Sequence, residues 1–164
     1  TQQIDAEIYF EKNSYRIARR IVEYRQNKRI ETNKELVEII KSTLSEKEKR
    51  KPGHPGRKVF QALRIEVNQE LEVLEKVLPA IERRLRPRGR MAVITFHSIE
   101  DRIVKLFVRE KENPCICPKD WPVCTCGRRP SLKAVTRKPI LPGADELAVN
   151  TRSRSAKLRV AEKI

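Results

Sequence analysis

The segment from Gly89 to Arg102 constrains the fold of this chain more than any other, because its character changes abruptly. A glycine-led turn precedes an apolar run, Met91 to Ile94, which is the pattern of a buried strand. The run stops at a polar cluster that starts with His97 and Ser98. Ser98 then precedes apolar residues at helical spacing, and Asp101 three residues later resembles a capping box. We predict a strand, a polar turn and a helix.

The polar cluster is a candidate catalytic site. Ligands of open α/β sheets bind at the carboxyl ends of strands, so we expect His97, Ser98 and Asp101 to line such a site. A structural role explains the same residues: Ser98 as the helix cap and Asp101 as a first-turn acid on the helix dipole. The sequence leaves both interpretations open.

Helical spacing dominates the first half of the chain. Ile17, Ile21 and Tyr24 mark one helix, and a capping box at Thr32 begins a second that should end near Leu44. Residues 45–58 contain two prolines and two glycines and predict a basic loop. Helical spacing returns over residues 59–85, with a junction expected at Asn68 and a new first turn or a kink at Pro79.

The C-terminal third predicts fewer regular elements. Residues 132–136 resemble a strand, Asp145 to Leu147 a short helix, and 156–161 a half-exposed final strand with alternating apolar side chains. Helices followed by three strands with helices between them indicate an α/β fold with a partial sheet.

Charge indicates the class of partner. The chain has 37 Lys and Arg against 22 Asp and Glu, a net charge of +15. Such a surplus favours a polyanion, with nucleic acid as the leading candidate, although a general solubilising role for Lys and Arg is the alternative. No apolar run of about 18 residues and no signal peptide is visible, so we predict no membrane partner. The candidate nucleic-acid-binding residues, for which the resemblance described below implies RNA, are Arg16, Arg19, Arg20, His54, Arg57, Lys58 and Arg64.

Four cysteines form a second group of chemically reactive side chains. Cys115 and Cys117 make one Cys-x-Cys pair, and Cys124 and Cys126 make another, within a loop predicted at residues 114–130. Four thiolates at close range can hold tetrahedral Zn²⁺, but the usual knuckle spacing is Cys-x₂-Cys. Three interpretations stay open: a zinc site, reduced loop cysteines, and a disulfide or redox pair.

These motifs together resemble the C-terminal part of the bacterial 16S rRNA (cytosine-N4)-methyltransferases, the RsmH or MraW family. The resemblance covers nearly the whole chain in the expected order. The segments that carry it are Gly53-His54-Pro55, Val59 to Ile65 with Val67-Asn68, Thr95 to Arg102, Thr136 to Ile140, and Arg154 to Glu162.

The resemblance implies a partial class I, Rossmann-like core that depends on S-adenosyl-L-methionine (AdoMet), with an inserted helical substrate-recognition domain. Residues 1–5 would end the fourth-strand motif of the core, 6–68 would form the insert, and 69–164 would complete the core. Gln3 matches a cofactor-contacting glutamine of the family. The Gly-rich turn and the ribose-binding carboxylate of the family's first half have no counterpart here. We therefore expect a truncated chain that is inactive alone.

The resemblance also implies a function. The family methylates N4 of a cytosine in the decoding region of 16S rRNA, on the small ribosomal subunit. Two alternatives remain: a non-catalytic rRNA-binding module derived from that family, and a zinc-stabilised ribosome-associated protein. We expect a cytoplasmic location, and exposed sheet edges make a homodimer plausible.

Overall fold

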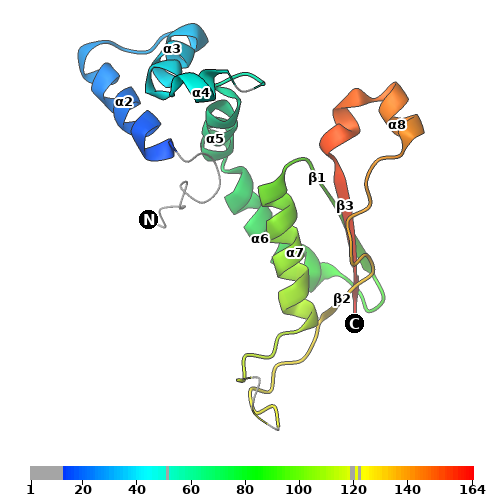
Figure 1. Ribbon diagram of the computed structural model, residues 1–164. Coiled ribbons are helices and arrows are strands. Elements are labelled where there is room, and N and C mark those ends of the chain that lie inside the picture. Colours follow the sequence, from blue (N-terminus) through cyan, green and yellow to red (C-terminus); the bar gives the residue numbers. More distant parts are fainter. Residues whose placement is uncertain (1–12, 51, 119–120, 122) are drawn as a thin grey trace. The chain divides into compact units, whose positions relative to one another are not determined.

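The computed structural model describes residues 13–50, 52–118, 121 and 123–164 (Figure 1). The chain divides into two compact units, Thr1–Gln69 and Glu70–Ile164. Gln69, in the left-handed conformation at φ 53°, ends the last helix of the first unit. The assignment of these units to a helical insert and a methyltransferase core stays a prediction.

The described part of the first unit is helical. A small apolar core of Ile17, Leu36 and Ile40 holds it, and Phe60 packs against this core. Its helices are α2 (Ser14–Asn27), α3 (Asn33–Thr43), α4 (Glu46–Lys49) and α5 (Arg57–Asn68).

Capping residues decide where these helices begin. Thr32 accepts a hydrogen bond from the backbone N–H of Glu35, and the Glu35 carboxylate accepts from the Thr32 N–H, so the predicted capping box is confirmed. The prediction of a loop from residue 45 to 58 is wrong in part. Ser45 and Glu48 make a second capping box that begins α4, and α5 already starts at Arg57.

The second unit combines helices with a three-stranded sheet. The sheet order is β1-β3-β2, and β3 is antiparallel to both neighbours, so β1 and β2 run in the same direction with α7 in the connection between them. The elements in chain order are α6 (Glu70–Arg84), β1 (Arg90–Thr95), α7 (Ser98–Glu112), β2 (Leu132–Ala134), α8 (Ala144–Val149), the 3₁₀ helix η1 (Thr151–Ser155) and β3 (Lys157–Lys163). The α/β character is confirmed, whereas the Rossmann-like class stays a prediction.

One hydrophobic core joins the helices to one face of the sheet. Leu78 of α6 and Val104 of α7 meet Met91 of β1, Leu132 of β2 and Ala161 of β3. All five side chains are buried. The part of the predicted helical spacing that follows the Asn68 junction, from Leu71 to Leu85, therefore supplies the α6 side of this core. Pro79 lies inside α6 and begins no new helix, because packing on both sides of it keeps the helix continuous.

The other face of the sheet is exposed in the described chain. Met91 and Thr95 of β1 are buried, but Ile94 is 60% exposed, so the prediction of a fully buried strand is wrong. The strand predicted over residues 156–161 is present as β3, but burial does not alternate along it and Leu158 and Val160 are not its buried set. Because Val93 is paired with Arg159 and Ile94 with Leu158, Arg159 faces the helices together with Lys157 and Ala161, whereas Leu158 and Val160 face away.

Candidate functional site

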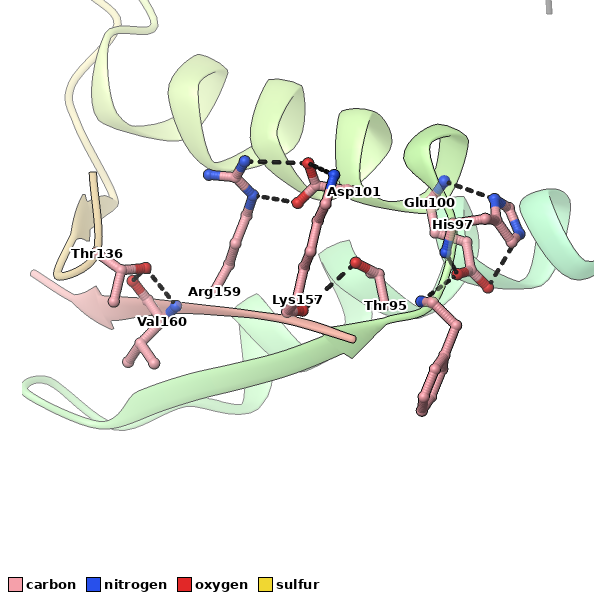
Figure 2. Close-up of polar contacts among 9 residues, drawn as sticks. Thr95, His97, Glu100, Asp101, Thr136, Lys157, Arg159 and Val160 are labelled. Atoms are coloured by element: carbon pink, nitrogen blue, oxygen red, sulfur yellow. Dashed lines mark hydrogen bonds and ion pairs between the residues drawn. The ribbon is translucent and has the colours of Figure 1, made fainter. Parts of the chain in front are cut away.

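The turn between β1 and α7 brings the predicted catalytic residues to one end of the sheet, and Figure 2 shows His97 and Asp101 of this set. His97, and not Ser98, is the N-cap of α7. Its Nδ1 accepts from the Glu100 N–H at 3.4 Å, and Glu100 Oε2 accepts from the N–H of His97 at 3.2 Å and of Phe96 at 2.9 Å. The capping box was thus predicted one residue too late. Both His97 and Ser98 can cap a helix, and only the backbone geometry decides between them.

The His97 ring is almost enclosed. Its side chain is 9% exposed, and Nε2 lies 3.3 Å from Glu100 Oε1. That contact lacks hydrogen-bond geometry, so Nε2 is a buried polar atom without a hydrogen-bond partner in the part of the chain that the structure describes. Because Nδ1 accepts a backbone hydrogen bond, the proton of the neutral ring is on Nε2. His97 therefore presents a donor at this position.

Glu70, His97 and Glu100 place one ligand atom each within 4.8 Å of one another. Two carboxylates and one imidazole resemble a cation site, but the ring does not fit one. A metal at Nε2 needs an unprotonated nitrogen there, while Nδ1 already accepts the Glu100 N–H. Both conditions together require an imidazolate. The cluster is better described as a donor ring beside two acceptors.

Asp101 has a different environment from His97. Its carboxylate accepts two parallel hydrogen bonds from Arg159, Nε to Oδ1 at 2.6 Å and Nη2 to Oδ2 at 3.1 Å. Lys157 Nζ lies 3.5 Å from Oδ2. The Arg159 hydrogen bonds, against the opposing effect of burial, hold the pKa of Asp101 below its usual range. Both carboxylate oxygens are therefore occupied by β3, and the geometry favours a structural role.

Ser98 is the exposed member of the predicted catalytic set. It is the first residue of α7, at the end of the helix where backbone N–H groups are free of helical partners. Its hydroxyl makes no hydrogen bond with the described residues. Ser98 is thus exposed to a ligand and His97 Nε2 is a buried donor without a partner among the described residues, whereas both carboxylate oxygens of Asp101 are already bound. Gln3, the predicted cofactor contact, lies outside the described residues, as does the whole 1–5 segment.

The predicted RNA-binding arginines of α2 are exposed, but each has an acidic neighbour. Arg19 Nε and Arg20 Nη1 both bind Glu23, at 2.9 and 3.4 Å, and Arg16 Nη2 lies 4.0 Å from Glu48. The Arg19 hydrogen bond lowers the pKa of Glu23. Exposed pairs of this kind are weak and exchange readily for other anions, so they leave the arginines able to meet phosphates.

The Gly-His-Pro loop lies beside a small groove in the same unit. Gly53, His54, Arg57 and Lys58 line an open space of about 150 Å³, together with Val59 and Ile17. The Gly56 N–H donates to His54 Nδ1 at 3.2 Å, which fixes the ring over the loop. Arg64 lies one to two turns further along α5 and is also exposed. The structure therefore brings His54, Arg57 and Lys58 together.

A second basic groove was not predicted. Lys105 and Arg109 of α7, with Arg137 after β2, line a shallow space of about 390 Å³ in the second unit. The signal was present in the sequence, since Lys105 and Arg109 are four residues apart on a predicted helix and so share one face. The helical pattern could not show that Arg137 joins them.

The four cysteines converge although the described residues of their loop form no helix or strand. The Sγ–Sγ separations are 3.5 Å for Cys115–Cys124 and Cys124–Cys126, and 3.9 Å for Cys117–Cys124 and Cys115–Cys126. All four thiols are free. Interactions with the backbone of Ile116 and Arg128 lower the pKa of Cys126 to about 6.

Comparison with known proteins decides the family. The chain matches the MraW methylase family over residues 4–164. The chain belongs to the MraW methylase family. Within the described residues, no helix is long and apolar enough to cross a membrane.

Proteins named ribosomal RNA small subunit methyltransferase H are similar to this chain. It is 53% identical over 148 residues to a ribosomal RNA small subunit methyltransferase H of Lachnospira eligens, covering 90% of this chain and 47% of that protein. It is also 53% identical over 154 residues to the protein of the same name from Clostridium botulinum strain Loch Maree, covering 94% of this chain and 50% of that protein. The chain thus spans about half the length of these relatives.

Proposed function

We propose that this chain carries the RNA-binding and base-positioning part of a small-subunit rRNA methyltransferase. The reaction we propose is AdoMet-dependent methylation of N4 of a cytosine in the decoding region of 16S rRNA. The match to the MraW methylase family and the names of its relatives support the reaction class. The observation that carries the local assignment is the almost enclosed His97 ring, whose Nε2 has no hydrogen-bond partner among the described residues.

The chemistry requires alignment more than activation. The exocyclic amine of cytosine is a poor nucleophile because its lone pair is conjugated with the ring, whereas the AdoMet methyl group is strongly electrophilic. The enzyme must hold the two in line and expose the base from its stack. In our proposal His97 Nε2–H donates to an acceptor on the base edge, and the Ser98 hydroxyl contacts the amine. Asp101 keeps α7 and β3 together through Arg159.

Several basic surfaces are available for the RNA backbone. We assign phosphate contacts to the α2 arginines Arg16, Arg19 and Arg20, and to His54, Arg57, Lys58 and Arg64 around the Gly-His-Pro loop. The groove lined by Lys105, Arg109 and Arg137 adds a further phosphate site. A net charge of +15 makes association with RNA strongly dependent on salt.

The exposed sheet face supports a place within a larger methyltransferase core. Ile94 is 60% exposed and Ile140 is 52% exposed, and both pair with Leu158 across the sheet, Ile94 by register and Ile140 by an isolated bridge. Apolar side chains in such a row are typical of a surface that another layer covers. We infer that the AdoMet-binding part of the family fold covers this face. The alternative function, a non-catalytic rRNA-binding module, leaves the same face free.

Two measurements on the 164-residue chain separate the two functions. The first is incubation of this chain, mixed with the part of the Lachnospira eligens relative that it does not match, with AdoMet and small-subunit rRNA, followed by nucleoside mass spectrometry; N4-methylcytidine supports the enzyme. The second is rRNA binding over a salt series. Binding that weakens steeply with salt, without methylation and without heat on AdoMet titration, supports the binding module. Absence of both methylation and salt-sensitive binding would overturn the proposal.

Matched charge variants test the RNA surface. Arg57→Gln with Lys58→Gln removes two adjacent cations of the Gly-His-Pro groove, whereas Arg83→Gln with Arg84→Gln removes two exposed cations at the end of α6. We expect the first pair to lower the slope of log K against log salt by roughly 2, because each phosphate that is no longer neutralised reduces the slope by about one. The second pair should leave the slope nearly unchanged. Equal slopes for the two variants contradict the assignment.

A further inference from the structure

The four cysteine thiols lie at the corners of a compact tetrahedron-like cluster. Four of the six Sγ–Sγ separations are between 3.5 and 3.9 Å, and all four sulfurs lie within 4.8 Å of one another. A disulfide has an S–S distance of about 2.05 Å, so no two of these sulfurs are bonded. The cluster thus holds four reduced thiols in mutual contact.

These separations match a metal geometry. Zn²⁺ binds thiolates at about 2.3 Å in a tetrahedron, which puts neighbouring sulfurs about 3.8 Å apart. The ligands come from two Cys-x-Cys pairs, so each pair contributes one edge and the chain between the pairs folds back to close the site. Chance proximity of exposed cysteines explains one short contact, but it does not explain four.

The loop needs such a centre, because it has no apolar core. Among the described residues of 113–130, none is buried, and its large apolar side chains face solvent: Ile116 is 66%, Trp121 52% and Val123 69% exposed. The loop is tied to the fold at its end, where the Ser131 N–H donates to the Lys111 carbonyl at 3.0 Å. Hydrophobic burial therefore cannot hold the segment between, whereas four metal–thiolate bonds can.

We propose that Cys115, Cys117, Cys124 and Cys126 bind one structural Zn²⁺. Four protein ligands fill a tetrahedral site and leave no open position, so the metal orders the loop and takes no part in methyl transfer. All-thiolate ligation selects zinc over magnesium, calcium or manganese, which prefer oxygen. Backbone hydrogen bonds of Ile116 and Arg128 to Cys126 help to orient this sulfur as a ligand. This inference is independent of the proposed function.

Metal content tests the proposal directly. The chain is purified without chelator under reducing conditions and analysed by inductively coupled plasma mass spectrometry. We expect one zinc per chain, and its replacement by Co²⁺ should give thiolate-to-cobalt charge transfer with the d–d bands of a tetrahedral site. Cys117→Ser and Cys124→Ser should each abolish stoichiometric metal binding. Ile116→Ala lies between two ligands, removes an exposed side chain and leaves all four thiols, so it should keep the zinc.

The consequence for the loop provides a second measurement. Removal of zinc by a chelator should speed amide hydrogen exchange in the loop by at least tenfold, while exchange in α7 and β3 stays unchanged. Zinc-free protein with four rapidly titrating thiols would overturn the proposal. Stoichiometric iron in place of zinc, or a mass lower by two hydrogens for each disulfide, would overturn it equally. A Cys117→Ser variant that retains a full equivalent of zinc is a further contradicting result.

Discussion

The Asp101–Arg159 pair is the strongest polar link between α7 and β3, so its removal gives a quantitative prediction. The two side chains are 12% and 11% exposed, and two parallel hydrogen bonds join them. Removing one partner of a buried pair costs about 3–5 kcal/mol, because the other charge stays buried and uncompensated. Lys157 lies beside the pair and is 33% exposed, so water can reach this site after the substitution and reduces its cost. We therefore expect Asp101→Ala to lower the free energy of unfolding by about 3 kcal/mol.

A double-mutant cycle isolates the pair itself. Arg159→Met keeps an unbranched chain of similar length and removes the charge, and the double variant leaves no charge unpaired. We expect the double variant to be more stable than the sum of the single effects by about 2 kcal/mol, the scale of hydrogen bonds between charged groups. Glu110→Gln on the exposed side of the same helix is the control and should change stability by less than about 0.5 kcal/mol.

The pair also predicts a pH dependence. Because Arg159 lowers the pKa of Asp101 in the folded state, the native protein binds fewer protons than the unfolded chain near that pKa. The contribution of the pair is therefore complete above the unfolded value of about 3.9 and is lost as the pH falls below it. The stability difference between the wild type and Asp101→Ala should be constant at neutral pH and should shrink below about pH 4.

Urea unfolding followed by circular dichroism measures these energies, and hydrogen exchange in α7 and β3 locates them in the second unit. An Asp101→Ala effect below about 1 kcal/mol, or a coupling energy near zero, would refute the structural role. Asp101 would then again be a candidate catalytic residue. In that case we expect Asp101→Ala to lower methylation without changing stability.

Three further predictions concern single residues. His97→Ala should destabilise the second unit by about 1 kcal/mol because it removes the α7 cap, whereas His97→Asn, which restores a capping oxygen, should recover most of it in urea unfolding. Gly53→Ala should cost about 1–2 kcal/mol because φ is 105°, although no atom lies within 4 Å of the new Cβ; an unchanged urea midpoint contradicts this. Ile40→Ala removes a fully buried side chain and should cost about 2–5 kcal/mol, with faster hydrogen exchange confined to the first unit.

The sequence located most elements because their causes are local. The Thr32 capping box and the apolar stripe of residues 71–85 are readable within a few residues, and both appear as predicted. Local signals also explain the errors. Two adjacent residues competed for the cap of α7, and the second capping box, at Ser45, lay inside a segment whose prolines and glycines favoured a loop.

The site required tertiary structure. Asp101 and Arg159 are 58 residues apart, and no periodicity links them. Their pairing follows from the register of β3 on β1, which turns Lys157 and Arg159 toward the helices beside Ala161 and turns Leu158 and Val160 away from them. Arg137 joins Lys105 and Arg109 for the same reason, since the position of the chain after β2 depends on strand order.

The amino-acid sequence by itself determines the helices and the family, and it places the four cysteines close together along the chain. The path of the 114–130 loop gathers those thiols into one cluster, whereas packing of segments far apart in the chain places Glu70 beside His97 and pairs Asp101 with Arg159. Helix caps and apolar periodicity depend on neighbours within about one turn, so a sequence contains them in full. Register, strand order and loop closure depend on contacts between segments far apart in the chain, whose energies appear only when the whole unit is packed.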